Sequence, residues 1–209
     1  MIRHILFDLD CTLYSVHYGL EENVLRRIRE YIFTRVDLPP EEGELLWRDG
    51  VKRYGTTIEW LITERSFTAI ADYYAYIHPE NEAETLPRDP ELRNFLENLP
   101  CPCSILTNSP GFHTERIIKK LGLEGIFQRI FDMETNAFKG KPSASAFHRA
   151  LDELALKPEE VFFIDDAPRN VDAYLALGGK GVLLDERDVH KDFPHERIRT
   201  LREITRFLN

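Results

Sequence analysis

The chain has 209 residues, 43% of them hydrophobic, which is enough for a packed core in one or two domains and excludes wholesale disorder. Its 27 Lys and Arg residues against 36 Asp and Glu residues leave a net charge of −9, which argues against nucleic acid or an anionic membrane as a partner. No apolar run approaches the roughly 20 residues that span a bilayer, and the three cysteines have no metal-binding spacing, so we expect a cytoplasmic protein.

The first part of the chain is predicted to contain one strand followed by helices. Residues 2–8 form an apolar run that breaks at the polar residues after it, as a buried strand would. Between residues 20 and 36, apolar side chains recur at intervals of three and four, which is typical of an amphipathic helix. Further helices are predicted over 41–54, through 60–62 and over 70–77, with no strand between about 15 and 85. The polar segment 78–90, which contains three prolines, is predicted to be a linker.

From residue 90 onward, predicted helices and strands alternate. The helices are 90–98, 112–121, 143–155, 169–177 and 196–208, and the strands are 103–107, 129–133, 161–165 and 181–184. Alternation of this kind implies right-handed crossovers and a parallel sheet. We therefore predict an α/β fold, in which residues 1–14 and 86–209 form a parallel sheet flanked by helices and residues 15–85 form an inserted all-helical domain.

Four polar motifs lie at the carboxyl ends of the predicted strands, where ligands bind in open parallel sheets. They are Asp8/Asp10/Thr12, then Thr107-Asn108-Ser109, then Lys141 in Gly140-Lys141-Pro142, and finally Asp165-Asp166. Each motif alone has an ordinary explanation, because a buried aspartate often caps a turn, Thr-Asn commonly starts a helix and Gly-Lys-Pro is a common loop. Their order and shared placement together indicate a functional site.

The residue types in these motifs indicate phosphoryl transfer. Four carboxylates in one crevice repel one another, and a bound cation or protonation relieves that repulsion. A few hard oxygen ligands, with water and substrate completing the coordination, suit Mg²⁺. A lysine and a hydroxyl group nearby suit an anionic substrate, and positioning with charge neutralisation supplies most of the catalysis of phosphoryl transfer.

The motifs FDLDCT, TNS, GKP and FIDD, in this order, resemble the four motifs of the haloacid dehalogenase-like (HAD) hydrolases, and the resemblance covers the whole chain. The helical insertion just after the first motif resembles the C1 cap class, which implies a Rossmann-like sheet with an all-helical cap. The first and last motifs, with Asn170 and the cap segment around Tyr54-Gly55, are similar to the pyrimidine 5′-nucleotidase branch, which more often has Asn where this chain has Cys11.

The resemblance implies roles for the first motif. Asp8 is the nucleophile that forms an aspartyl-phosphate, and its other oxygen binds Mg²⁺. Asp10 protonates the leaving group and then activates water, and its backbone carbonyl binds Mg²⁺, while Thr12 supports the turn that places Asp10. To act as an acid near neutral pH, Asp10 needs a pKa above roughly 4, which burial and neighbouring carboxylates can provide.

The other motifs are implied to hold the phosphoryl group and the metal. Thr107 and the backbone of Asn108 bind the phosphoryl oxygens, and Lys141 neutralises both the nucleophile and the phosphoryl group. Asp166 is the expected direct metal ligand, with Asp165 either a further ligand or placed just behind it.

Other conspicuous residues are expected to have structural roles. Cys11 is expected to be a small buried residue, and Asn170 to cap or orient the loop after Asp166. The seven histidines show no ligand spacing, and His17, near the hinge into the insertion, is the one candidate among them to face substrate. Most aromatic residues of the insertion should form its core, with one or two left to stack on a base.

The expected protein is a Mg²⁺-dependent phosphomonoester hydrolase, a monomer or small homo-oligomer whose partner is a small phosphorylated metabolite, with pyrimidine nucleoside monophosphates favoured. Alternative substrates are a sugar phosphate or phosphoglycolate, and a phosphomutase is a less favoured reaction on the same core. Dehalogenase activity is disfavoured because it needs no second aspartate at Asp10. A non-catalytic phosphometabolite-binding protein is the alternative from another class, and it would show no Mg²⁺-dependent turnover.

Overall fold

A parallel sheet with six strands forms the centre of the computed structural model within the residues that it describes, 1–39 and 41–208. The strands are β1 (His4–Phe7), β2 (Cys103–Leu106), β3 (Ile130–Phe131), β4 (Val161–Asp165), β5 (Lys180–Leu184) and β6 (Arg197–Ile198). They lie in the order β3-β2-β1-β4-β5-β6, so that β1 is central and lies between β2 and β4. The predicted α/β fold with a parallel sheet is confirmed.

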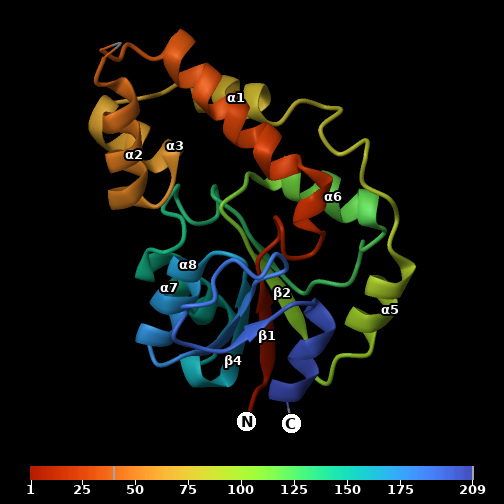
Figure 1. The fold of residues 1–209 in the computed structure, drawn as a ribbon. Coiled ribbons are helices and arrows are strands. Elements are labelled where there is room, and N and C mark those ends of the chain that lie inside the picture. The colour runs from red at the N-terminus through yellow and green to blue at the C-terminus, as the bar shows by residue number, and fades with distance from the viewer. Residues whose placement is uncertain (40, 209) are drawn as a thin grey trace.

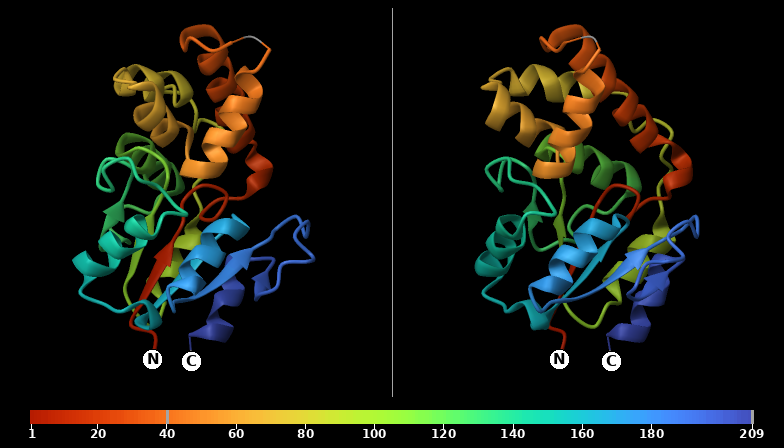
Figure 2. Two further views of the ribbon diagram at one scale, coloured as in Figure 1. Left: turned by 90° about the vertical axis from the view of Figure 1, so that its left-hand side faces the viewer. Right: turned by 60° about the vertical axis from the view of Figure 1, so that its left-hand side comes forward.

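Helices cover both faces of this sheet (Figures 1 and 2). They are α5 (Pro90–Glu97), α6 (Gly111–Leu121), α7 (Ala144–Leu154) and α8 (Pro168–Ala176), with the 3₁₀ helices η2 (Pro158–Glu160) and η3 (Leu201–Phe207). Side chains alternate along β1, so Phe7 packs with α5, α6 and η3 on one face, whereas Leu6 packs with α7 and α8 on the other. None of the helices in the described part of the chain is long and apolar enough to cross a membrane.

The segment between β1 and residue 78 is helical and lies over the carboxyl ends of the strands (Figure 1). It contains η1 (Val16–Tyr18), α1 (Leu20–Arg35), α2 (Gly43–Tyr54), α3 (Thr57–Arg65) and α4 (Ile70–Ile77), and we call it the cap. Its core is built largely from aromatic side chains, among them Tyr31, Trp60 and Tyr73, as expected from the sequence. Edge-to-face packing of Tyr31 on Tyr73, with centroids 5.2 Å apart, is one of the contacts that fix α1 against α4.

The predicted linker has no helix or strand between residues 78 and 89, but it is not a solvated tether. Ala83 and Leu86 are buried in the core beside the sheet, and His78 is 5% exposed. Asp89 then caps α5 by accepting a hydrogen bond from the Leu92 N–H at 2.8 Å. The polar composition of this segment therefore conceals buried contacts, which are important for the site described below.

The prediction of a helix over 196–208 is wrong. Arg197–Ile198 instead pairs with Leu183–Leu184 as a sixth strand, and the 3₁₀ helix η3 begins only after Thr200. A reciprocal capping box between Thr200 and Glu203 stops helical structure from extending further back. A strand of two residues inside a charged stretch has no periodicity that a sequence pattern could reveal.

Candidate active site

Three of the four motifs meet because the strands that precede them are neighbours. Phe7 is paired with Ile105 on one side and with Ile164 on the other, so Asp8, Thr107 and Asp165 arrive together at the carboxyl edge. All three side chains are buried. This placement agrees with the rule that open parallel sheets bind ligands at this edge.

Lys141 joins two of these carboxylates. Its Nζ donates to Asp8 Oδ1 and to Asp165 Oδ2, each at 2.6 Å, and its side chain is 1% exposed. Asn108 holds the lysine backbone from both sides, since its Oδ1 accepts from Lys141 N at 2.7 Å and its Nδ2 donates to Lys141 O at 2.9 Å. The second and third motifs thus form one unit that aims the lysine at Asp8.

The Asp8 carboxyl is short of compensating charge despite this lysine. Burial raises its pKa to about 8, with Asp165 and Asp10 adding to the rise, and Lys141 offsets only part of it. The Thr12 hydroxyl also donates to Asp8 Oδ2, at 3.4 Å. For Lys141, burial alone would lower the pKa, but Asp165 and Asp8 outweigh burial and raise it, so the lysine is a permanent cation.

The two adjacent aspartates of the last motif have different surroundings. Asp165 is fully buried, and its oxygens accept from Lys141 Nζ, from the Ala167 N–H at 2.8 Å and from Asn170 Nδ2 at 2.9 and 3.1 Å. Within the described residues, the Asp166 carboxylate accepts no hydrogen bond, and burial, followed by repulsion from Asp165 and Asp8, raises its pKa to about 9. Asn170 therefore orients Asp165 itself, where a role in the loop after Asp166 was expected, and Asp166 keeps its oxygens available.

The donor set at this edge fits Mg²⁺. Oxygens of Asp8, Asp165 and Asp166 lie within 4.8 Å of one another, and burial together with repulsion among these carboxylates raises the pKa of Asp8 and Asp166. Asp165 accepts four hydrogen bonds, whereas Asp8 accepts one from Lys141 and a long one of 3.4 Å from Thr12, so Asp8 and Asp166 have more capacity for a metal ion. Hard oxygen ligands few enough to leave places for water suit magnesium.

A second acidic group beside Asp166 contains Cys11 and Glu21. Cys11 is buried, and its thiol lies 3.4 Å from Glu21 Oε2, with burial as the main cause that raises its pKa. A thiol that holds its proton is a poor metal ligand, so this group does not extend the magnesium site. Cys11 also has a φ of 57°, a left-handed conformation that turns the chain between Asp10 and Thr12. It is the small buried residue that was expected.

The carboxylate of Asp10 is held by three side chains. The Tyr14 hydroxyl donates to Oδ1 at 2.6 Å, the Ser109 hydroxyl donates to Oδ2 at 2.6 Å, and His113 Nε2 lies 2.8 Å from Oδ1. The remaining surface of the side chain, 27%, faces the cleft. The turn after Asp8 therefore brings Asp10 to the cleft in a defined orientation.

The expected rise in the pKa of Asp10 is contradicted by these contacts. Burial would raise the pKa, but the cationic His113 and the hydrogen bonds outweigh burial and lower it below its usual value. For His113, burial would lower the pKa, whereas Asp10 and Glu82 raise it to about 9. In the resting site the proton is held by the His113–Asp10 pair, on the imidazole side.

The cap closes over this edge and leaves a cleft of about 250 Å³. Its cap wall is mainly apolar and includes Val24, Ile28, Ile58, Tyr73, Tyr74 and Ile77. At the tip of the cap, Gly55 has a φ of +87°, and a Cβ there would lie 2.8 Å from both Lys141 O and Pro142 Cδ. Arg169 Nη2 donates to Gly55 O at 2.8 Å and ties the tip to α8.

Several residues near the site were not assigned to it from the sequence. His113, on the first turn of α6, contacts Asp10 directly. Glu82, in the segment predicted to be a linker, contacts His113 and so reaches Asp10 through it. A histidine on the otherwise apolar buried face of α6, in register with Ile117, was the available signal. His17 is exposed and does not line the cleft.

The fold and these motifs are those of the haloacid dehalogenase-like hydrolases, and the chain belongs to that family, whose model matches residues 2–178. A curated relative from Clostridium perfringens, named for a pyrophosphatase (PpaX), is 23% identical over 186 residues, which cover 86% of this chain and 82% of the relative.

Solved structures of the same family share the fold over the full length. The HAD hydrolase YfnB from Bacillus subtilis, bound to magnesium, covers 100% of this chain and 99% of its own, with a TM-score of 0.67 and 20% identity. L-2-haloacid dehalogenase from Xanthobacter autotrophicus covers 100% of both chains, with a TM-score of 0.63 and 15% identity. At these identities the structures show the fold and leave the substrate open.

Proposed function

We propose that this hydrolase is a Mg²⁺-dependent phosphatase of small phosphomonoesters. The observation that carries the proposal is the buried Lys141, which bridges Asp8 and Asp165 at 2.6 Å while a second aspartate, Asp10, faces the same cleft. A dehalogenase has no need for an acid at that second position, whereas a phosphate ester has a leaving oxygen that must gain a proton.

In the first step an Asp8 oxygen forms a bond to phosphorus, and the bond from phosphorus to the leaving oxygen breaks. The proton that His113 and Asp10 share passes through Asp10 to the leaving oxygen, so an alcohol departs and Asp8 carries the phosphoryl group. Lys141 neutralises charge on the phosphoryl oxygens. The Thr107 hydroxyl accepts from the Ser109 N–H at 3.0 Å, and its hydrogen can be donated to a phosphoryl oxygen. In the second step Asp10 takes a proton from water as that water attacks phosphorus, and the Asp8–phosphorus bond breaks.

Asp8, Asp166 and the backbone carbonyl of Asp10 would hold Mg²⁺, which would supply positive charge that offsets repulsion between a carboxylate and a phosphate dianion. The raised pKa values of Asp8 and Asp166 support this assignment, as does the magnesium in the YfnB relative. Asp165 then serves chiefly to hold Lys141.

The apolar lining of the cap favours an organic leaving group over a second phosphate. We propose pyrimidine nucleoside 5′-monophosphates as the substrates. Among the described residues that line the cleft, the permanent cations are Lys141 and Arg169, and both are already engaged. A second phosphate, as in pyrophosphate, would lack partners there. Tyr73 and Tyr74 offer aromatic surface, and stacking on a base contributes on the order of 1–3 kcal/mol.

The nucleophile assignment is tested by Asp8→Asn. This change keeps the shape but removes the attacking charge and a metal ligand, so activity on an aryl phosphate with Mg²⁺ should fall by several orders of magnitude. A variant that keeps more than about a tenth of kcat/KM, a loss of only about 1.4 kcal/mol, refutes the assignment. Absence of turnover by the unaltered protein would favour the non-catalytic binding protein.

Substrate preference is tested with a panel of phosphomonoesters, read as released phosphate. UMP or CMP should have a higher kcat/KM than AMP or GMP, because hydrogen bonds to the base edge select one base and mismatched polar groups are costly when buried. Equal rates for all four nucleotides, or a clear preference for a sugar phosphate, would remove the nucleotidase assignment and leave the phosphatase one.

A further inference from the structure

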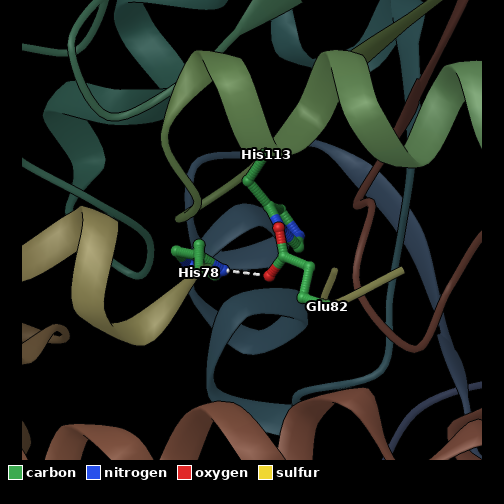
Figure 3. A group of neighbouring side chains, drawn as sticks. All are labelled: His78, Glu82 and His113. Atoms are coloured by element: carbon green, nitrogen blue, oxygen red, sulfur yellow. Dashed lines mark hydrogen bonds and ion pairs between the residues drawn. The ribbon is translucent and has the colours of Figure 1, made fainter. Parts of the chain in front are cut away.

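A buried polar network connects Asp10 to the end of the cap. Figure 3 shows three of its side chains, His78, Glu82 and His113. His78 follows α4, Glu82 lies in the turns after it and His113 lies on α6; the three side chains are 4%, 2% and 1% exposed. His113 Nδ1 lies 2.9 Å from Glu82 Oε1, and His78 Nδ1 lies 2.7 Å from Glu82 Oε2. Arg116 also pairs with Glu82.

This network has the residue types of a metal site but the spacing of an ion-pair network. Bonds of about 2.0–2.1 Å from a tetrahedral zinc ion would place neighbouring ligand atoms about 3.3 Å apart. The two measured imidazole–carboxylate separations, 2.7 and 2.9 Å, are hydrogen-bond lengths. Arg116 on the same carboxylate supplies positive charge where a metal ion would otherwise be needed.

The geometry fixes the orientation of the His113 ring. Its Nε2 lies at hydrogen-bond distance from Asp10, and its Nδ1 forms an ion pair with Glu82 without hydrogen-bond geometry, so the ring lies between two carboxylates. His78 lies against it, with ring centroids 4.2 Å apart. Tyr14 and Ser109 donate to Asp10 through hydroxyl hydrogens that can turn about the C–O bond, whereas the direction of the His113 N–H is fixed by the plane of its ring.

From these contacts we infer that His113, held by Glu82, is a positioning residue that aligns Asp10 with the leaving oxygen of the substrate. The inference rests on the proposed phosphatase activity, in which Asp10 exchanges a proton with that oxygen. His78 and Glu82 belong to the stretch that leads from the cap back to the core, and His78 lines the cleft. The alignment of Asp10 therefore depends on how the segment that contains His78 and Glu82 packs against α6.

Two substitutions of one residue separate positioning from packing. His113→Gln keeps an amide N–H near the Nε2 position and retains the contact with Asp10, whereas His113→Asn keeps one near Nδ1 and retains only the contact with Glu82. With phenyl phosphate and Mg²⁺, His113→Asn should lower kcat about 10- to 100-fold and His113→Gln only a few-fold, with KM changed less than about threefold. With dinitrophenyl phosphate, whose leaving group needs no proton, both losses should be less than about threefold.

The test of whether His113 acts through Asp10 is to combine each His113 substitution with Asp10→Asn. If His113 acts through Asp10, His113→Asn should add almost nothing to the loss already caused by Asp10→Asn on phenyl phosphate. Glu82→Gln should reproduce the leaving-group dependence of His113→Asn in weaker form, which keeps the test valid should one variant fold poorly. His148→Gln, an exposed histidine on α7, is the matched control and should match the unaltered protein.

Equal losses on the two esters, equal losses for Asn and Gln at position 113, or full additivity with Asp10→Asn would each overturn the inference. An unaltered protein that hydrolyses neither ester would instead overturn the proposed function on which the inference rests.

Discussion

Two acidic clusters border the cleft, and they differ in how their charge is balanced. The Asp8 cluster comprises Asp8, Asp165, Asp166 and Lys141, with one cation for three carboxylates. The Asp10 network comprises Asp10, Glu82, His78, His113 and Arg116, with two cations for two carboxylates.

The pKa values follow this difference. In the Asp8 cluster, burial raises the pKa of Asp8 to about 8 and that of Asp166 to about 9. In the Asp10 network, burial is outweighed by the contacts of His113 and His78, and the pKa of Glu82 is lowered to about 2. The charge of the Asp10 network is balanced within the chain, whereas the Asp8 cluster has the excess of carboxylates that fits the proposed magnesium ion.

Removal of a cation from each cluster should give the largest contrast. Lys141→Met leaves Asp8 and Asp165 buried without a cation, so kcat on an aryl phosphate should fall by about 10³-fold or more and the free energy of unfolding by about 3 kcal/mol. Arg116→Met leaves Glu82 with two imidazoles and should cost about 1 kcal/mol and less than about tenfold in kcat. Steady-state kinetics and urea unfolding measure both; similar losses for the two variants would contradict the contrast.

Magnesium should stabilise the protein through the Asp8 cluster alone. At a Mg²⁺ concentration 100 times its Kd, the folded state gains about 2.7 kcal/mol, which raises Tm by about 5–10 °C for a chain of this size. Thermal unfolding with Mg²⁺ or with EDTA measures the shift. Asp166→Asn should lose most of it and Glu82→Gln should keep it, whereas the reverse result would place the metal in the Asp10 network.

The pH dependence of stability should have opposite signs in the two clusters. A carboxyl whose pKa is raised on folding, such as Asp166, binds more protons in the folded state, so its contribution is lost as the pH rises from about 4 to about 9. Glu82, whose pKa is lowered to about 2, contributes stability above about 4.5 that is lost as the pH falls towards 2.

Urea unfolding in EDTA at pH 5, 6, 7 and 8 measures the first effect. The unaltered protein should lose about 1–2 kcal/mol more than Asp166→Asn across this range, and Mg²⁺ should abolish the difference. A protein that gains stability relative to Asp166→Asn as the pH rises would show that Asp166 is compensated within the chain.

The predictability of the two clusters from the sequence differs for a physical reason. Asp8, Thr107 and Asp165 follow strands whose apolar runs are visible, and parallel pairing then brings their ends together, so local patterns were sufficient. Lys141 was recognisable only from its motif, because a long loop delivers it to Asp8.

The Asp10 network depends on contacts that leave no local pattern. His113 lies 103 positions from Asp10 in sequence, and Glu82 sits in turns whose composition is that of a linker. The contacts form only when the end of the cap is seated on α6. The two-residue strand β6 was missed for a similar reason, because its place is decided by pairing with β5 and not by its own residues.

The seat of the cap tip on the core has a consequence for how this enzyme could diversify. Gly55 meets the carbonyl of Lys141 and the ring of Pro142, and its own carbonyl is held by Arg169. Nearby, Glu59 Oε2 accepts from the Gly140 N–H at 3.2 Å. Cap side chains away from these contacts can therefore be exchanged without disturbing the lysine below. Selection on new substrates is free to act on the cap as long as position 55 keeps a residue that tolerates a φ of +87° and has no Cβ.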